Sequence, residues 1–206
     1  WQEGQKHGKG TIHYSDGSSY EGEWQNDQPH GKGTYTYVNG HVYTGSFQNG
    51  DRHGTGQYLV ENGVLYYEGN WRGDQKHGQG ALYDEDGSKL YEGGFQHGLA
   101  AGIGKEFRQD GTPYYEGEFA SGAKHGSGTF FTLNSTLSFR GTLANGMRSG
   151  TGDEYRDDGS LFYSGGWQND RKHGQGSLFS PDGTKIYVGA FVDDIRIGFG
   201  EEFRDD

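Results

Sequence analysis

Aromatic residues and glycines alternate with polar residues in short segments of this chain. Residues 20–24 read Tyr-Glu-Gly-Glu-Trp, so two rings and a glycine occupy alternate positions and two glutamates lie between them. Successive side chains of a β-strand point to opposite faces. The segment is therefore predicted to be a strand with one aromatic face and one solvated face.

This segment recurs with a nearly constant period. Its first step is 23 residues and each later step is 24, and the copies begin at Tyr20, Tyr43, Tyr67, Tyr91, Tyr115, Phe139, Tyr163 and Tyr187. A Gly-x-Gly element follows the same period, at residues 8–10, 31–33, 54–56, 78–80, 102–104, 126–128, 150–152, 174–176 and 198–200. Self-similarity at a fixed period of this length indicates a repeat architecture.

Each repeat is predicted to be a β-hairpin. The aromatic strand leads into a turn, the Gly-x-Gly opens the return strand, and an Asp-Gly or Asn-Gly pair connects most units to the next. Glycine weakens the interior of a strand, so we expect these glycines to leave room for the rings. The predicted fold is all-β: an elongated, solenoid-like array of about nine hairpin repeats forming one twisted antiparallel sheet.

The repeat boundaries predict a single array over residues 1–206. A truncated repeat at 1–19 precedes seven full repeats at 20–186, and a truncated repeat at 187–206 follows them. The chain begins with Trp1 inside one repeat and stops inside another. We therefore expect it to be a segment of a longer protein.

Composition narrows the class of protein. Glycine accounts for 41 residues and hydrophobic residues for only 29%, which suits either a disordered chain or a repetitive β array. An aromatic content of 15% decides for the array, because disordered chains are depleted in rings. The chain has no cysteine, which excludes disulfides and thiolate metal sites. A net charge of -11 argues against nucleic acid as the main partner.

The repeated motif resembles the MORN (membrane occupation and recognition nexus) repeat. The pattern Y-x-G-x-W-x-x-G-x-x-H-G-x-G is matched nearly in full at residues 67–80 and 115–128, and more loosely over the rest of the chain. The resemblance implies a scaffold rather than an enzyme, with a partner helix held against the array. It also implies a cytoplasmic, cytoskeleton-associated location, with membrane association as an alternative.

The aromatic face is the first candidate site. A single sheet has no second layer to cover its rings, so part of this face is expected to stay open as a groove for a helix or an extended peptide. Stacking of the rings on the glycines and on one another is the alternative reading. The groove residues are Tyr20, Trp24, Tyr43, Phe47, Tyr67, Trp71, Tyr91, Phe95, Tyr115, Phe119, Tyr163, Trp167, Tyr187 and Phe191.

A row of basic residues is the second candidate site. It lies two positions before the Gly-x-Gly, is interrupted by Pro29 and Ala100, and consists of Lys6, Arg52, Lys76, Lys124, Arg148, Lys172 and Arg196. Turns along one sheet edge would make this row a ladder of cations for anionic lipid headgroups. This membrane-recognition module, binding phosphoinositides, is the alternative function. A solvated loop edge is the simpler interpretation of the same row.

Histidines recur just before the Gly-x-Gly, at His7, His30, His53, His77, His125 and His173. One repeat advances about 10 Å along the array, whereas zinc ligands all lie about 2 Å from one ion. Neighbouring histidines therefore cannot share a metal within one chain, and no metal or other cofactor is expected. Catalysis is not expected either, because an active site is unique and every polar feature here is repeated.

The last repeat departs from the pattern in its loop and return strand, where Ile197 replaces the histidine and lies between the apolar residues Ile195 and Phe199. Apolar side chains beside an unpaired strand edge favour self-association. We expect a homodimer through the C-terminal repeats. Drift of a terminal repeat is the other interpretation.

Choline- and glucan-binding arrays also use hairpins rich in Tyr, Trp and Gly. They place paired aromatics in a different frame and lack the His-Gly-x-Gly element, which this chain carries. The sequence therefore favours a structural scaffold that mediates protein–protein interaction and self-association.

Overall fold

The computed structural model describes residues 1–203, and nearly all of them lie in β-strands or in the turns between them. Seventeen strands are joined by short loops, and one loop contains a single 3₁₀ turn, η1 (Glu61–Gly63). The strands are β1 (Gly8–His13), β2 (Ser19–Gln25), β3 (Gln28–Thr36), β4 (Val42–Gln48), β5 (Asp51–Leu59), β6 (Leu65–Arg72), β7 (Gln75–Tyr83), β8 (Lys89–Gln96), β9 (Leu99–Phe107), β10 (Pro113–Ala120), β11 (Ala123–Phe131), β12 (Leu137–Ala144), β13 (Met147–Tyr155), β14 (Leu161–Gln168), β15 (Arg171–Phe179), β16 (Lys185–Val192) and β17 (Ile195–Glu202).

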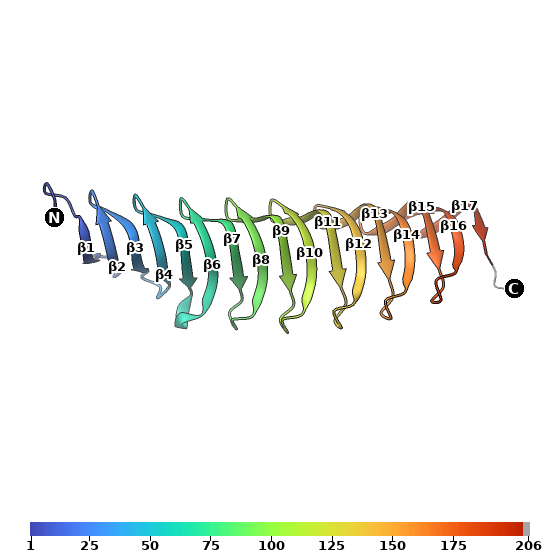
Figure 1. Cartoon of the computed structure of the whole chain (residues 1–206), viewed down its shortest axis with the longest axis horizontal. Helices are drawn as coiled ribbons and strands as arrows, with labels where there is room; N and C mark the ends of the chain where they lie inside the picture. Colours follow the sequence, from blue (N-terminus) through green and yellow to red (C-terminus); the bar gives the residue numbers. More distant parts are fainter. Residues whose placement is uncertain (204–206) are drawn as a thin grey trace. The chain divides into compact units, whose positions relative to one another are not determined.

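The chain divides into two compact units. Unit 1 comprises residues 1–100 with 109–111, and unit 2 comprises residues 101–108 with 112–206. In unit 1 each strand from β1 to β8 pairs antiparallel with the next strand in the sequence. In unit 2 the same holds from β9 to β17. Successive strands therefore reverse direction, as Figure 1 shows, and the predicted all-β hairpin fold is confirmed.

Two-residue turns join each aromatic strand to its return strand. Asn26 and Asp27 both have positive φ, at 49° and 64°, as a type I′ hairpin turn requires. The same pair of positive φ values occurs at residues 49–50, 73–74, 97–98, 121–122, 145–146, 169–170 and 193–194. Because the turn is this short, β3 begins at Gln28. The prediction that the Gly-x-Gly opens the return strand was therefore wrong by three residues.

The first glycine of each Gly-x-Gly allows a bulge in the return strand. Gly22 is opposite Gly33 and Trp24 is opposite Pro29, so three residues of β3 face one residue of β2. Gly31, within the bulge, has a φ of +64°, a conformation that other residues rarely adopt.

The core is a layer of rings lying on paired glycines. Tyr20 is fully buried, and a Cβ placed on Gly33 would lie 2.5 Å from a carbon of the Tyr20 ring. The Tyr20 hydroxyl donates a hydrogen bond to the Glu23 carbonyl at 2.8 Å. The glycines therefore make room for the rings, as the sequence predicted.

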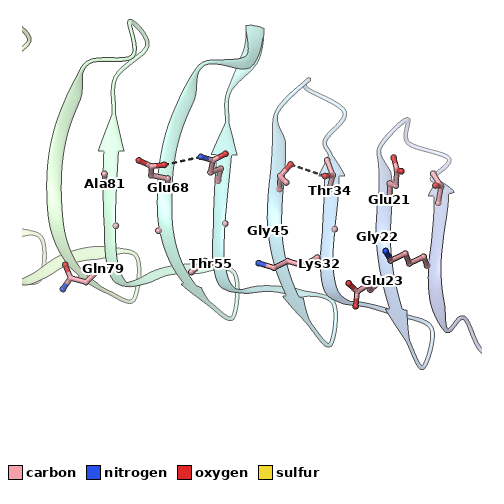
Figure 2. Close-up of a pocket in the computed structure, with 18 of the residues that line it drawn as sticks. Glu21, Gly22, Glu23, Lys32, Thr34, Gly45, Thr55, Glu68, Gln79 and Ala81 are labelled. Carbon is pink, nitrogen blue, oxygen red and sulfur yellow. Dashed lines mark hydrogen bonds between the residues drawn. The ribbon is translucent and has the colours of Figure 1, made fainter.

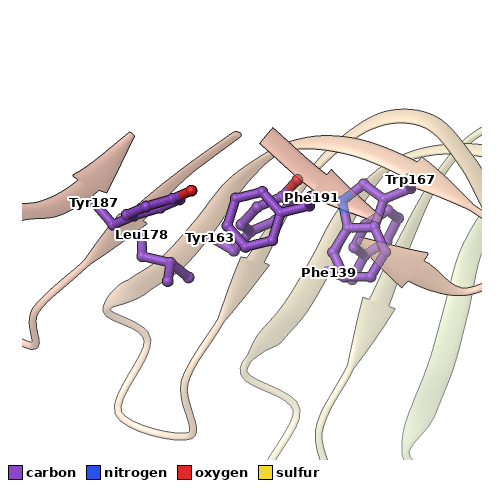
Figure 3. Packing of buried hydrophobic residues seen from close by; sticks show 6 residues of the cluster. All are labelled: Phe139, Tyr163, Trp167, Leu178, Tyr187 and Phe191. Atoms are coloured by element: carbon purple, nitrogen blue, oxygen red, sulfur yellow. The ribbon is translucent and has the colours of Figure 1, made fainter. Parts of the chain in front are cut away.

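Neighbouring rings meet edge to face along the core. In unit 2 the Tyr163 ring lies 5.3 Å from the Trp167 ring and 5.2 Å from the Phe191 ring, with interplanar angles of 89° and 82°. Figure 3 shows these rings beside Phe139, Leu178 and Tyr187. Edge-to-face contacts of this kind stabilise aromatic pairs beyond the area they bury.

Candidate functional site

The aromatic face is closed in this structure. All fourteen rings that were predicted to line a groove are buried, with exposures of 0–6%. The predicted opening is therefore wrong, because the rings pack on the glycines and on one another, as the alternative reading held. Whether any of these residues contacts a partner stays a prediction.

The basic row forms a second layer over these rings. The Arg148 guanidinium lies 4.0 Å from the centre of the Trp167 ring, and the Arg52 guanidinium lies 4.3 Å from that of Trp71. The remaining members of the row lie over rings in the same way: Lys6, Lys76, Lys124, Lys172 and Arg196. Cation–π contacts thus bring together the two sets of residues that the sequence had assigned to separate sites.

Carboxylates balance most charges of the basic row. Lys124 pairs with Glu106 at 2.6 Å, and Lys172 pairs with Glu154 at 2.7 Å. Further pairs join Arg52 to Asp74, Arg148 to Asp170 and Glu154, and Arg196 to Glu202. The carboxylates offset the charge of these five cations, so the row presents less net positive charge to a lipid headgroup. Headgroup binding by this row stays a prediction.

The type I′ turns add a link between successive repeats. The Asp74 carboxylate accepts hydrogen bonds from the Arg52 backbone N–H and from its Nε, both at 2.9 Å. The Asp74 N–H in turn donates to the Arg52 carbonyl at 3.2 Å. The same carboxylate-to-backbone contact recurs at Asp27, Asp170 and Asp194. Each of these turns is thereby fixed to a basic residue of the preceding repeat.

The histidine row shows no metal-binding geometry. Among residues 1–203 there is no group of three or more His, Asp, Glu or Cys side chains that could hold an ion. His41, which lies outside the row, places its Nδ1 2.9 Å from the Tyr58 hydroxyl. This contact could not be read from the period, because His41 lies in a loop between repeats.

The open surface of unit 1 is its polar face. A groove of about 1270 Å³ crosses the unit, and the paired glycines form its floor. Figure 2 shows its polar side chains on either side of the glycines. Thr34 and Thr44 share a hydrogen bond of 3.1 Å, and Gln57 donates to Glu68 at 3.2 Å. The charged lining residues are Lys9, Glu21, Glu23, Lys32, Glu68, Lys89 and Glu92.

Unit 2 has a smaller hollow on its own polar face. Its volume is about 670 Å³, and its polar lining includes Glu116, Ser127, Thr129, Arg140, Thr142 and Asp153. Sequence reasoning placed such residues on a solvated face and proposed no site there. The glycine pattern could have predicted the hollow. Glycines that leave room for rings on one face also leave a floor without side chains on the other face.

The apolar residues of the last strand are exposed. Ile195, Ile197 and Phe199 of β17 have exposures of 67%, 43% and 108%. Ile195 is opposite Val192 of β16, and Ile197 is opposite Ala190, so apolar positions continue onto the adjacent strand. The surface is available for the predicted self-association, which stays a proposal.

Within residues 1–203 no helix is long and apolar enough to cross a membrane. A family model described as MORN repeat matches eight segments, at residues 1–19, 20–42, 43–64, 67–89, 91–112, 115–132, 139–161 and 163–185. No curated protein matches the chain.

Proposed function

The chain belongs to the MORN-repeat family, and we propose on that premise that it is a non-enzymatic scaffold whose unit 1 binds a protein segment along its polar face. The family consists of repeat proteins that bind proteins or membranes. The observation that supports a protein ligand is the contrast between the two faces of unit 1. One is closed by rings and cations, and the other is hollowed over a glycine floor.

The charges of the groove indicate the chemistry of the partner. Four glutamates and three lysines line it, so its charge is mixed and slightly negative. Lys89 is already paired with Glu92 at 2.6 Å. Such a surface offers no excess of cations to an anionic membrane, and its glutamates complement a polar segment that carries basic residues.

Substitution within the groove tests the proposal. We expect the Thr44→Arg variant to lose the capture of proteins that the parent chain binds from a lysate, because the long side chain fills the groove. The control is Thr129→Arg, which changes the hollow of unit 2 and should leave the captured set unchanged. Identical capture by the parent and Thr44→Arg would contradict a binding role for this groove.

Vesicle flotation tests membrane recognition as the alternative. We expect no flotation with phosphoinositide-containing vesicles at physiological salt, because the basic row is packed against rings. Flotation that is lost on changing Lys76, Lys124 and Lys172 to Glu, in a chain that still melts cooperatively, would make membrane recognition the primary function.

Self-association through β17 is the second part of the proposal. Its support is the exposure of Ile195, Ile197 and Phe199. We expect light scattering to report about twice the chain mass of 22.7 kDa, and to report the single-chain mass after all three are changed to Ser. A parent chain of single mass would contradict it. A cytoplasmic, cytoskeleton-associated location rests on family resemblance alone.

A further inference from the structure

Three lysines of the basic row, spaced 48 residues apart, occupy equivalent positions over rings. We call each of these positions a seat. Lys76 Nζ lies 5.5 Å from the Tyr66 ring centre, and Lys124 Nζ lies 5.2 Å from that of Tyr114. Lys172 Nζ lies 5.2 Å from that of Phe162. Each lysine also lies over the core ring that follows in sequence: Tyr67, Tyr115 and Tyr163. The surroundings of these three equivalent lysines can therefore be compared within one chain.

Two of the three seats include a carboxylate. The residue 18 positions before Lys124 is Glu106, and the residue 18 positions before Lys172 is Glu154. Their oxygens lie 2.6 and 2.7 Å from the lysine nitrogens. The position before Lys76 is Tyr58, which has no carboxylate to offer.

The same difference extends to the neighbouring arginine. In unit 2, Glu154 lies between Arg148, at 3.3 Å, and Lys172. In unit 1, Tyr58 is the equivalent of Glu154, and the Arg52 guanidinium lies 5.5 Å from the centre of its ring. Arg52 is nevertheless paired with Asp74. Lys76 has no ion pair with any residue in the described part of the chain.

The seat is accessible from outside. Lys76 is half-buried, and the adjacent Tyr66 is 39% exposed. The Tyr58 hydroxyl is held by His41. Burial among the rings lowers the pKa of Lys76. An ammonium group that has lost part of its hydration and gained no counterion attracts an anion.

We propose that Lys76, which lies over Tyr66 and has Tyr58 at the position of the glutamate of the other two repeats, is a docking point for one carboxylate of an acidic protein segment. The group that fills this seat in the two equivalent repeats is a glutamate, which defines the ligand chemistry. The neighbouring Arg52 is neutralised by Asp74, so the seat presents one cation rather than the cluster that an anionic membrane needs. The site lies on the aromatic face and does not depend on the groove.

Titration with an acetylated, amidated tetraglutamate tests this site, with the tetraglutamine peptide as the matched probe. The side-chain ¹⁵Nζ signals of Lys76, Lys124 and Lys172 report occupancy in the whole chain. We expect tetraglutamate to shift the Lys76 signal saturably, leaving the other two unchanged, and tetraglutamine to shift none. Equal shifts of all three lysines would overturn the proposal, since that is non-specific attraction.

Changing Tyr58 separates a carboxylate site from a general surface effect. Tyr58→Glu supplies the group that the other repeats carry, so the peptide should bind at least about tenfold more weakly. Tyr58→Gln removes the ring without adding a charge and should retain binding, and Lys76→Gln should abolish it. Peptide affinity that is unchanged in Tyr58→Glu or Lys76→Gln would overturn the proposal. So would vesicle binding that requires Lys76 in a chain that ignores the peptide.

Discussion

At the scale of single residues, the fold depends on glycines that face rings. The second glycine of the Gly-x-Gly and the glycine of the aromatic strand lie opposite each other, and one ring covers both. A methyl group at either position would occupy space that the ring fills. The position is therefore restricted by packing, whereas the first glycine of the motif is restricted by its positive φ.

Gly33→Ala should lower the free energy of unfolding by about 3 kcal/mol, because the new Cβ would collide with the rigid ring of Tyr20. Gly10→Ala is the matched control, since Gly10 holds the same place in the motif but its Cβ would lie 3.6 Å from Trp24, an ordinary contact. Urea denaturation measures both. Equal losses would show that backbone entropy, and not the ring, sets the requirement.

Alkaline pH should unfold the chain through the buried phenols. Burial raises the pKa of Tyr20 and of Tyr163 to about 12, from an ordinary value of 10.0. The neutral phenol is favoured in the folded state, so stability is intact below pH 10 and falls as pH rises from 10 towards 12. The loss is about 1.4 kcal/mol per phenol per pH unit.

Thermal melts between pH 9 and 12, with tyrosinate absorbance recorded in parallel, check this expectation. The core phenols should ionise only as the fold is lost. A melting temperature that stays constant to pH 12 would contradict it.

Sequence could predict the role of the glycines but not that of the cations. Alternation alone places a ring opposite a glycine. The contact between Arg148 and Trp167 depends on the bulge and on pairing between strands, which the period does not describe. The basic row was therefore predicted to be a free edge, although its side chains lie over the rings of the core.

At the scale of elements, the turns hold one repeat to the next. Asp74 binds the backbone and the side chain of Arg52 from its place in a type I′ turn. Other turns carry glycine at this place, as at Gly50 and Gly98, and keep the same backbone shape. The carboxylate is thus an added tie and not a requirement of the turn.

Asp74→Gly should cost about 1–2 kcal/mol, because it removes the charge-assisted bond but preserves the positive φ. Asp74→Asn retains an acceptor for the Arg52 N–H and should cost less than about 1 kcal/mol, the value of an exposed ion pair. Chemical denaturation of the two variants measures the difference. An equal cost for both would assign the effect to the ion pair alone.

The strand starts show where element-level prediction stops. Hairpins, their order and their aromatic strands followed from the period. The return strands begin before the Gly-x-Gly because residues such as Ser121 and His97 adopt positive φ in the turn. The identity of these residues does not by itself predict a positive φ. The conformation of these turns becomes evident only from the pairing of the two strands in the structure.

At the scale of the whole chain, stability is local. The principal contacts of each strand within a unit are with the strands next to it in the sequence. Such arrays behave as a sum of repeat and interface terms, so damage in one repeat spreads only to its neighbours. Among residues 1–203, the repeats share no central core.

Hydrogen exchange of the Gly33→Ala variant should reveal this locality. Amides of β2 to β4 should exchange faster than in the parent, while those of β13 to β16 in unit 2 should keep their rates. Uniform acceleration across both units would instead show that the chain unfolds as one cooperative block.

The family and the fold class could be predicted because the same motif recurs in every repeat. The partner could not, because the residue between the two glycines, which faces the groove, differs from repeat to repeat. Position by position, the residue between the two glycines is Lys9, Lys32, Thr55, Gln79, Ile103, Ser127, Thr151, Gln175 and Phe199.

That freedom has an evolutionary consequence. The glycine floor separates the two faces. Substitutions on the groove face can therefore change which ligand binds without changing the packing of the rings. Selection for a new ligand and selection for folding act on different positions of the same strands. A library randomised only at the positions between the glycines should therefore yield mostly folded members with divergent ligands, which is the property sought in a display scaffold.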